Sequence, residues 1–231
     1  MLEKEKNLLK YISIQINNIF PSVDALVSLD VQCFEIAIQR TKQCLNSIKA
    51  CNDEEFNYLN SWQYAIFIYY FSHTYWSLKK NTDIATKLFL LNKALNGIDL
   101  YYDIEFPANF IIGHTVGMVF AKAKYGNYCI FHQGCTVGRN KNNRPVLEDG
   151  VILYPHASVI GKCLVRENTV VSPGVQLVNQ DTPGNCYVFT GINGKPVFKE
   201  INEYFADRYF DRKKDTVDIW LNYSKKWMEN G

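Results

Sequence analysis

An apolar residue recurs every six positions through the middle of this chain. From residue 147 to residue 177 the repeat is unbroken, and the position four residues later always holds a small or β-branched side chain. A period of six fits neither an α-helix nor a long strand, but it fits a short strand and a turn that repeat together. Three such units can close a triangular coil that buries its inward side chains against the next coil. The apolar series is Leu147, Leu153, Val159, Val165, Val171 and Leu177, and the second series is Val151, Ala157, Cys163, Thr169 and Val175.

The same frame continues upstream with two interruptions. Six-residue spacing links Tyr125 to Val137 and Leu100 to Met118, with Val116 expected at a small inward position. One extra residue lies between Met118 and Tyr125, and the polar segment 138–145 is predicted to loop out. Ordinary antiparallel hairpins, the alternative, would give strict alternation and irregular spacing.

Helical periodicity flanks this region on both sides. We expect a helical N-terminal domain over residues 1–97, repeated coils over 98–198, and a helical C-terminal extension over 199–231. Asn96-Gly97 supplies a stop signal for the last N-terminal helix. The tail has two apolar faces: Ile201, Tyr204, Phe205 and Tyr209, then Val217, Trp220, Leu221 and Trp227.

Charge, apolar runs and cysteine content limit which partners and which cell compartment we expect. The chain has 25 basic and 23 acidic residues among its 231, so its net charge of +2 and lack of a basic stripe argue against a nucleic-acid partner. No apolar run is long enough to span a membrane, and the N-terminus lacks a signal-peptide pattern. Seven scattered cysteines without a CxxC motif indicate buried thiols in a cytoplasmic protein and no metal site.

The first coils carry a family resemblance. The segments Gly97–Leu100 and Ile112–Gly117 resemble the signature of serine O-acetyltransferases, which are hexapeptide-repeat acyltransferases. Weaker similarity lies in Tyr58–Gln63, His73–Trp76, Cys135–Gly138 and Thr190–Lys195, so that residues 50–198 are covered. The resemblance implies an α+β fold with a left-handed parallel β-helix, acetyl-CoA as co-substrate, and a homotrimer that can pair into a dimer of trimers.

The resemblance also implies a catalytic pair. In this family an aspartate opens the β-helix and a histidine fifteen residues later acts as base, and Asp99 and His114 have that spacing. An alcohol is a poor nucleophile near neutral pH, so a base is needed, and a carboxylate can hold the imidazole in one orientation. The other interpretations are a surface histidine at a coil turn and an aspartate that caps a turn. We expect structural or coenzyme-contact roles for His132 and His156, and packing for His73.

The acceptor-binding residues of the family are only partly present. An aspartate precedes the family's catalytic histidine, whereas Gly113 occupies that position here. The acceptor loop is shorter and retains Arg144 without its histidine, and Asp53 is the possible counterpart of an acidic residue in the helical domain. For the coenzyme, the resemblance suggests Gly138, Ala157 and, near the diphosphate, Lys195.

The sequence therefore predicts a cytoplasmic, acetyl-CoA-dependent O-acetyltransferase that acts on a hydroxyl of a small-molecule acceptor. Serine and a sugar or nucleotide sugar of surface-polysaccharide biosynthesis both stay open as acceptors, because the missing residues bind the acceptor rather than catalyse. N-acetylation of an amino sugar is a further alternative. A non-catalytic trimeric β-helix scaffold is the alternative from another class, and it gives no reason for the Asp99–His114 spacing.

Overall fold

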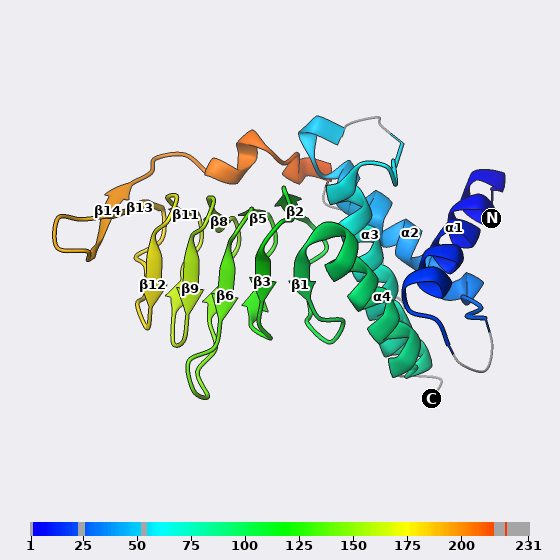
Figure 1. The fold of residues 1–231 in the computed structure, drawn as a ribbon. Helices are drawn as coiled ribbons and strands as arrows, with labels where there is room; N and C mark the ends of the chain where they lie inside the picture. The colour runs from blue at the N-terminus through cyan, green and yellow to red at the C-terminus, as the bar shows by residue number, and fades with distance from the viewer. Residues whose placement is uncertain (1, 23–25, 52–54, 215–219, 221–231) are drawn as a thin grey trace, which may run out of the picture.

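The chain folds as a group of helices followed by a coil of short parallel strands (Figure 1). The computed structural model describes residues 2–22, 26–51, 55–214 and 220. The N-terminal helices are α1 (Glu3–Ile19), α2 (Val31–Asn46), α3 (Ser61–Thr74) and α4 (Thr82–Asn96), with a π-helical turn over Tyr75–Lys79 and a 3-10 turn over Lys49–Cys51. Within the described residues, no helix combines the length and apolar character that crossing a bilayer requires.

Three sheets form the walls of the coil. The front sheet of Figure 1 contains β1 (Ile98–Leu100), β3 (Met118–Phe120), β6 (Thr136–Gly138), β9 (Ser158–Ile160) and β12 (Gln176–Val178). The back sheet contains β2 (Phe110–Gly113), β5 (Cys129–His132), β8 (Ile152–Leu153), β11 (Thr169–Val171), β13 (Cys186–Thr190) and β14 (Pro196–Glu200). The third sheet contains β4 (Lys124–Tyr125), β7 (Val146–Leu147) and β10 (Leu164–Val165). All pairs are parallel except β13 with β14, and the coil makes about five turns, which confirms the predicted fold class of helical domain and β-helix.

The six-residue repeat is the core of the coil. Every residue of the apolar series from Leu147 to Leu177 is at most 1% exposed, and the small-residue series is buried as well. Each inward side chain packs on its equivalents in neighbouring coils, for example Val159 between Val137 and Leu177. The repeat over residues 147–177 was therefore predicted correctly.

Upstream, the predicted frame is wrong by two residues at one place. Phe120, not Met118, pairs with Val137, and Met118 pairs with Ile98. Val116, predicted to point inward, is 72% exposed. Both Met118 and Phe120 are apolar and buried, so composition alone could not tell which of them carries the repeat.

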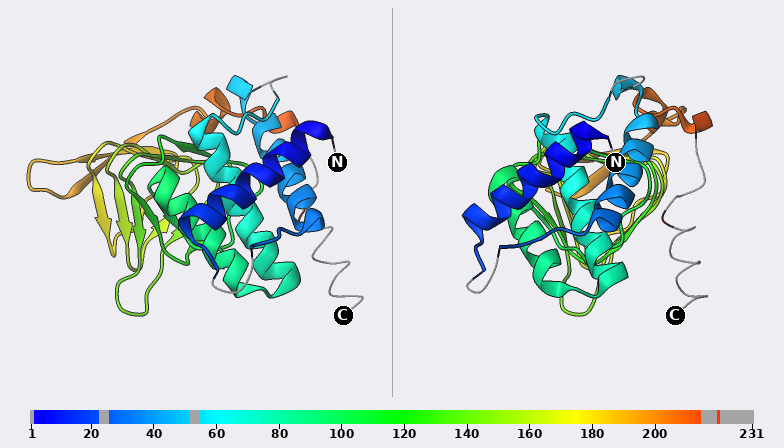
Figure 2. Two further views of the ribbon diagram at one scale, coloured as in Figure 1. Left: turned by 45° about the vertical axis from the view of Figure 1, so that its right-hand side comes forward. Right: turned by 90° about the vertical axis from the view of Figure 1, so that its right-hand side faces the viewer.

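The helices stack against one end of the coil, as the turned views show (Figure 2). Helix α3 is buried along nearly its whole length, because α2 and α4 cover two of its sides and the coil lies beside it. Asp30 caps α2 by accepting a hydrogen bond from the Cys33 amide. Gly97 ends α4 in the left-handed conformation (φ 66°), as the sequence predicted.

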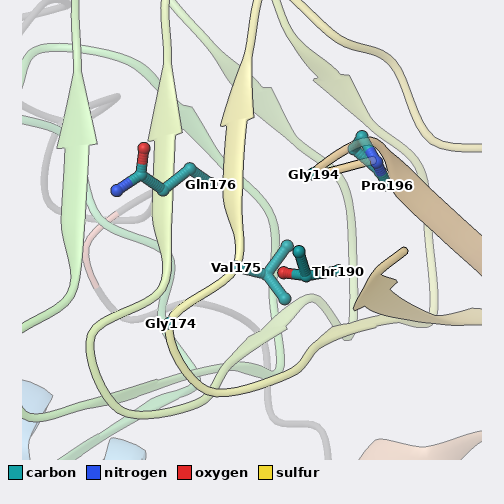
Figure 3. Close-up of a pocket in the computed structure, with 6 residues that line it drawn as sticks. All are labelled: Gly174, Val175, Gln176, Thr190, Gly194 and Pro196. Atoms are coloured by element: carbon teal, nitrogen blue, oxygen red, sulfur yellow. The ribbon is translucent and has the colours of Figure 1, made fainter. Parts of the chain in front are cut away.

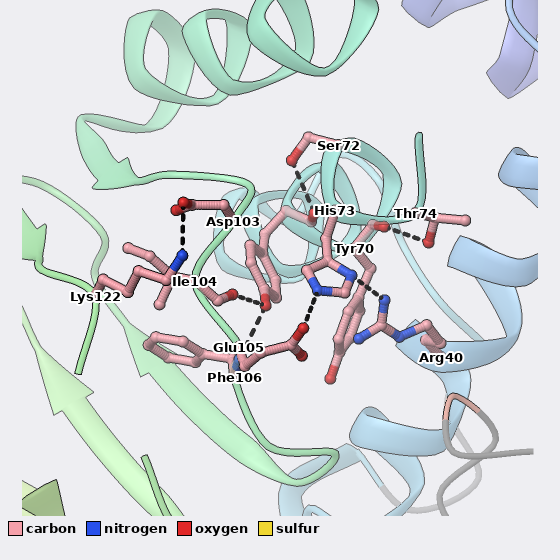
Figure 4. A network of polar contacts seen from close by, with 11 residues as sticks. Arg40, Tyr70, Ser72, His73, Thr74, Asp103, Ile104, Glu105, Phe106 and Lys122 are labelled. Atoms are coloured by element: carbon pink, nitrogen blue, oxygen red, sulfur yellow. Dashed lines mark hydrogen bonds and ion pairs between the residues drawn. The ribbon is translucent and has the colours of Figure 1, made fainter. Parts of the chain in front are cut away.

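A polar chain that is buried at Arg40 and His73 and exposed at Glu105 joins the helices to the first coil (Figure 4). Arg40 on α2 donates to Nδ1 of His73 on α3 at 3.0 Å, and His73 Nε2 lies 3.2 Å from the Glu105 carboxylate in the segment between β1 and β2. Arginine only donates, so Nδ1 must accept and Nε2 carries the proton of a neutral imidazole. Burial lowers the pKa of His73 and favours this neutral form. His73 thus has the packing role that we expected.

The C-terminal segment returns along the outer face of the back sheet. Its 3-10 turns cover Phe205–Arg208 and Arg212–Lys214. Ile201 and Phe205 are buried in one cluster with Ile130, Ile152 and Val170. Tyr204 and Tyr209 are partly buried against it, so the first predicted apolar face packs on the coil although it forms short turns rather than a long helix. Of the second predicted face, Trp220 lies against His73, with 5.1 Å between the ring centroids, and Val217, Leu221 and Trp227 lie outside the described residues.

One side chain fastens this segment to the coil, and its removal tests the arrangement. Asn168, 1% exposed, donates to Asn185 and to the Glu203 carbonyl, and accepts from the Phe205 amide. We expect Asn168→Ala to lower the free energy of unfolding by about 3 kcal/mol, about 1 kcal/mol for each hydrogen bond. Denaturant unfolding measures this loss.

The control is Asn179→Ala. Asn179 also has a left-handed backbone, with φ 50° against 52° for Asn168, but it is exposed and accepts one hydrogen bond, from the Lys162 amide. It should lose about 1 kcal/mol. Equal losses in the two variants would contradict the anchoring role of Asn168.

Candidate active site

The chain turns from the back sheet to the front sheet once in each coil, and we call these turns the corners. Each corner lies between two residues that point into the coil. The later corners contain three residues each, 132–134, 154–156 and 172–174. The first corner contains five, residues 113–117, because Phe120 rather than Met118 pairs with Val137. The first corner is therefore two residues longer than the others.

The longer corner presents His114 to solvent. Two of its residues, His114 and Gly117, have left-handed backbones (φ 57° and 78°), whereas each later corner has one, at Gly134, His156 or Gly174. Thr115 turns inward and is 4% exposed, while His114 and Val116 point outward. A left-handed backbone costs a non-glycine residue about 1 kcal/mol, which the surrounding coil must offset.

Asp99 lies on the coil next to this corner. Its strand β1 pairs with β3, with Asp99 opposite Val119, and the Gly97 carbonyl accepts a hydrogen bond from the Gly117 amide. The Asp99 carboxylate forms an ion pair with Lys93 on α4, at 2.7 Å between Oδ2 and Nζ. Among the described residues no hydrogen bond joins Asp99 to His114, so the orienting role of Asp99 stays a prediction.

A second histidine lies directly beside the first corner. His132 pairs with Gly113 across β2 and β5, and a Cβ atom on Gly113 would lie 3.6 Å from its Nδ1. On its other side the imidazole stacks on Tyr154, with 5.0 Å between centroids and 9° between planes. Burial lowers the pKa of His132, and the nearby His114 lowers it further, so the ring is neutral at physiological pH.

Two polar atoms at this place have no hydrogen-bond partner. They are His132 Nε2 and Gln133 Oε1, the only buried side-chain atoms without a partner that were found within the described residues. Buried polar groups are nearly always hydrogen-bonded, so such a pair next to an exposed histidine indicates a site that a ligand completes. The sequence predicted a structural or coenzyme-contact role for His132 and no role for Gln133, because it does not show how close their side chains lie to His114.

Within one chain, the residues predicted to bind the acceptor do not lie close together. Gly113 lies at the first corner, beside His132. Arg144 is exposed on the loop that follows β6, which projects below the front sheet in Figure 1, at the opposite end of that sheet from the corners. Asp53 lies outside the described residues.

The predicted coenzyme residues are also spread out. Gly138 ends β6, near the Arg144 loop, and Ala157 points into the coil and is fully buried, with its amide and carbonyl both hydrogen-bonded. Lys195 is exposed in the hairpin between β13 and β14. Within the described parts of the chain, no group of three or more His, Cys, Asp or Glu side chains could hold a metal ion.

A pocket of about 190 Å³ lies where the fourth corner meets this hairpin (Figure 3). Its lining residues are Gly174, Val175, Gln176, Thr190, Gly194 and Pro196. Lys195 lies between two of them in the sequence. The corners thus form a line along the coil that begins at His114 and ends at this pocket.

Solved structures with the same arrangement of helices and coil are serine acetyltransferases. The enzyme of Neisseria gonorrhoeae is 21% identical over 90% of this chain and 84% of its own, with a TM-score of 0.66. The same enzyme in complex with serine is 24% identical over 73% and 70%, with a TM-score of 0.58. The chain has the serine acetyltransferase fold.

A coenzyme A complex is among the similar structures. It is the serine acetyltransferase of Brucella abortus strain S19, 14% identical over 84% of this chain and 75% of its own, with a TM-score of 0.55. No model of a protein family and no curated protein matches the sequence. At these identities the similarity shows the fold, and function has to be argued from the site.

The neutral state of His132 can be measured directly. We expect the His132 ring to titrate below pH 6.5 in an NMR pH series, and His114→Gln to move its pKa back toward 6.5, because one cause of the lowering is then removed. Since the unfolded chain takes up this proton before the folded chain does, His132 makes the protein less stable as the pH falls below 6.5. A His132 pKa at or above 6.5 would contradict its buried, neutral state.

Proposed function

We propose that this chain is an acetyl-CoA-dependent O-acetyltransferase in which His114 is the general base. The observation that supports this most strongly is the lengthened first corner, which exposes a histidine one coil away from a carboxylate. The serine acetyltransferase fold supports the same reaction class. Asp99 and His114, which the sequence suggested as a pair, keep their proposed roles.

The chemistry needs one proton carrier. The His114 imidazole takes the proton of the acceptor hydroxyl as the oxygen attacks the thioester carbon. The tetrahedral intermediate then collapses, the C–S bond breaks, and the imidazolium returns the proton to the departing thiolate. The products are the acetyl ester and free coenzyme A, so that atoms and protons balance.

Asp99 must turn to orient His114, because Lys93 holds its carboxylate through Oδ2. That ion pair is partly exposed, with the two side chains 52% and 35% accessible, and exposed pairs contribute about 0.2–1 kcal/mol. Breaking this ion pair therefore costs little free energy, and an imidazolium that forms on His114 can replace Lys93 as the partner of Asp99. We propose that Asp99 turns toward His114 when the acceptor and coenzyme are bound.

The line of corners supports a path for acetyl-CoA. Three coil spacings of about 4.8 Å separate the first corner from the fourth, about 14 Å in all. Along it the thioester would lie at His114 and the nucleotide end would approach the pocket beside Gly194, where Lys195 can neutralise phosphate. The Brucella enzyme of the same fold binds coenzyme A, which supports the choice of co-substrate. Ala157, which is buried, is not part of the path.

The spread of the remaining residues supports a site between two copies of the chain. Gly138 and Arg144 lie at the other end of the front sheet from His114, so one chain cannot bring all three to one site. A neighbouring coil placed side by side brings the Arg144 loop of one copy to the corner of the next. We therefore propose a homotrimer; its pairing into a dimer of trimers stays a prediction. The seven free, buried cysteines support a cytoplasmic location.

The first test is release of coenzyme A thiol from acetyl-CoA with an acceptor panel of L-serine, methyl pyranosides and nucleotide sugars. We expect acceptor-dependent release, and His114→Ala should lower kcat by about 10²- to 10⁴-fold, the usual contribution of a general base. No release with any of these hydroxyl compounds would contradict the proposed function. Coenzyme A binding without turnover would instead support the scaffold alternative, and a His114→Ala variant with an unchanged rate would contradict the mechanism.

The control for His114→Ala is a pair of variants at the ion pair. Asp99→Asn should lower kcat by about tenfold or more, because it removes the charge that stabilises the imidazolium. Lys93→Met should leave kcat within about threefold, since the exposed pair itself contributes little. A loss in Lys93→Met as large as that in Asp99→Asn would mean that the pair acts by holding the fold.

The two-chain site predicts complementation between inactive variants. A 1:1 mixture of His114→Ala and Arg144→Ala chains, co-expressed and assayed with the acceptor well below its KM, should regain about a quarter of wild-type activity, because a quarter of random neighbours combine both intact residues. The measurement is the specific activity of the purified mixed trimer. Activity equal to the mean of the two parent variants would contradict a shared site.

A further inference from the structure

The corners around His114 are uncharged apart from their histidines, and the Asp99 carboxylate on the preceding coil is paired with Lys93. The corner residues 113–117, 132–134, 154–156 and 172–174 include no Asp, Glu, Lys or Arg. A free amino acid has two charged ends, and each needs a partner when it is bound away from water. The side of the site that this chain supplies is therefore poorly suited to an amino acid and well suited to a neutral acceptor.

The missing side chain of Gly113 leaves a flat aromatic surface next to the base. Tyr154 stacks on one face of the His132 ring. On the other side, Gly113 of the preceding coil has no side chain that could cover the ring. The face of an aromatic ring is apolar and electron-rich, so it suits the C–H groups on one face of a pyranose. The position is one residue from His114, so a ring bound there would have its hydroxyls beside the base.

The unpartnered atoms add polar contacts at the same place. His132 Nε2 and Gln133 Oε1 are buried beside the first corner, where no protein group satisfies them. A polyhydroxylated ring supplies both donors and acceptors, and a small turn of the two side chains would bring these atoms to it. An apolar ligand would leave both atoms without a partner.

We propose that Gly113, His132 and Tyr154 form the acceptor subsite, and that the acceptor is a neutral sugar ring that stacks on His132. This inference rests on the proposed function and specifies its substrate class. His132 acts here as a binding and positioning residue, while His114 remains the base. Beyond Tyr154 the surface continues into a mainly apolar hollow of about 290 Å³ with Tyr187 and Phe189 in its wall, which leaves room for a sugar attached to a larger group.

Acceptor competition separates this inference from the proposed function. With the full-length protein and acetyl-CoA, methyl pyranosides should support thiol release at millimolar concentration and L-serine should not. Release with serine alone would overturn the sugar subsite and leave the O-acetyltransferase intact. Release with neither of these, nor with the nucleotide sugars of the panel, would overturn both.

Three variants test the subsite itself by steady-state kinetics with the active pyranoside. His132→Ala should raise the acceptor KM by about tenfold or more, because it removes the stacking surface. His132→Phe keeps a ring and should restore most of that loss. Gly113→Ala, whose new Cβ fits at ordinary contact distance, should raise the acceptor KM by covering the ring. In all three variants the KM for acetyl-CoA should stay within about twofold of the wild-type value. A general structural defect would change both KM values.

The matched control is Ile111→Val, on the same strand and the same face as Gly113 but away from the corner. It should leave the acceptor KM unchanged. An unchanged acceptor KM in both His132→Ala and Gly113→Ala would overturn the proposal. Equal rises in the KM values of acceptor and acetyl-CoA would also overturn it, since the residues would then support the fold rather than the acceptor.

Discussion

The pairing of Phe120 with Val137 is the constraint on which the candidate site depends. Each coil must place its inward side chains over those of the next, because an unmatched layer would leave apolar surface or a cavity. Once Phe120 occupies the layer of Val137, the two extra residues must leave the wall at the corner. The exposed position of His114 is thus a consequence of how the core packs. The His114 side chain needs no contact of its own to stay exposed.

The same stacking explains why the site is rigid on one side and incomplete on the other. Gly113, His132 and Tyr154 are the first residues of successive corners, so the strand spacing alone fixes the imidazole between the glycine and the phenol ring. The helices hold the first coil from beyond its end through Arg40, His73 and Glu105. Arg144 lies across the front sheet on an exposed loop, and in the proposed trimer the loop of a second copy brings it to the corner.

The sequence predicted the fold correctly where its pattern allowed one interpretation. From Leu147 to Leu177 the spacing never varies, and the coil follows from it. Around Met118 two apolar residues compete for one layer, and only the packing of the finished coil decides between them. The pairing of Gly113 with His132 follows from the predicted frame, which places Ile112 over Phe131, but the frame does not show which outward side chains form a site. The ion pair of Asp99 with Lys93 joins a helix to the coil, and a comparison with family spacing cannot predict it.

Acceptor choice follows from which side chain is missing rather than from which is present. A carboxylate at position 113 would sit over the His132 ring, attract a cation and cover the stacking surface at once. Glycine there does the reverse: it removes the charge and uncovers the ring, while the base, its neighbouring coil and the line of corners toward the pocket stay unchanged. On the proposed function, one fold keeps the same transfer chemistry and exchanges a charged acceptor for a neutral one through a single position, because residue 113 adjoins the proposed base and faces the His132 ring.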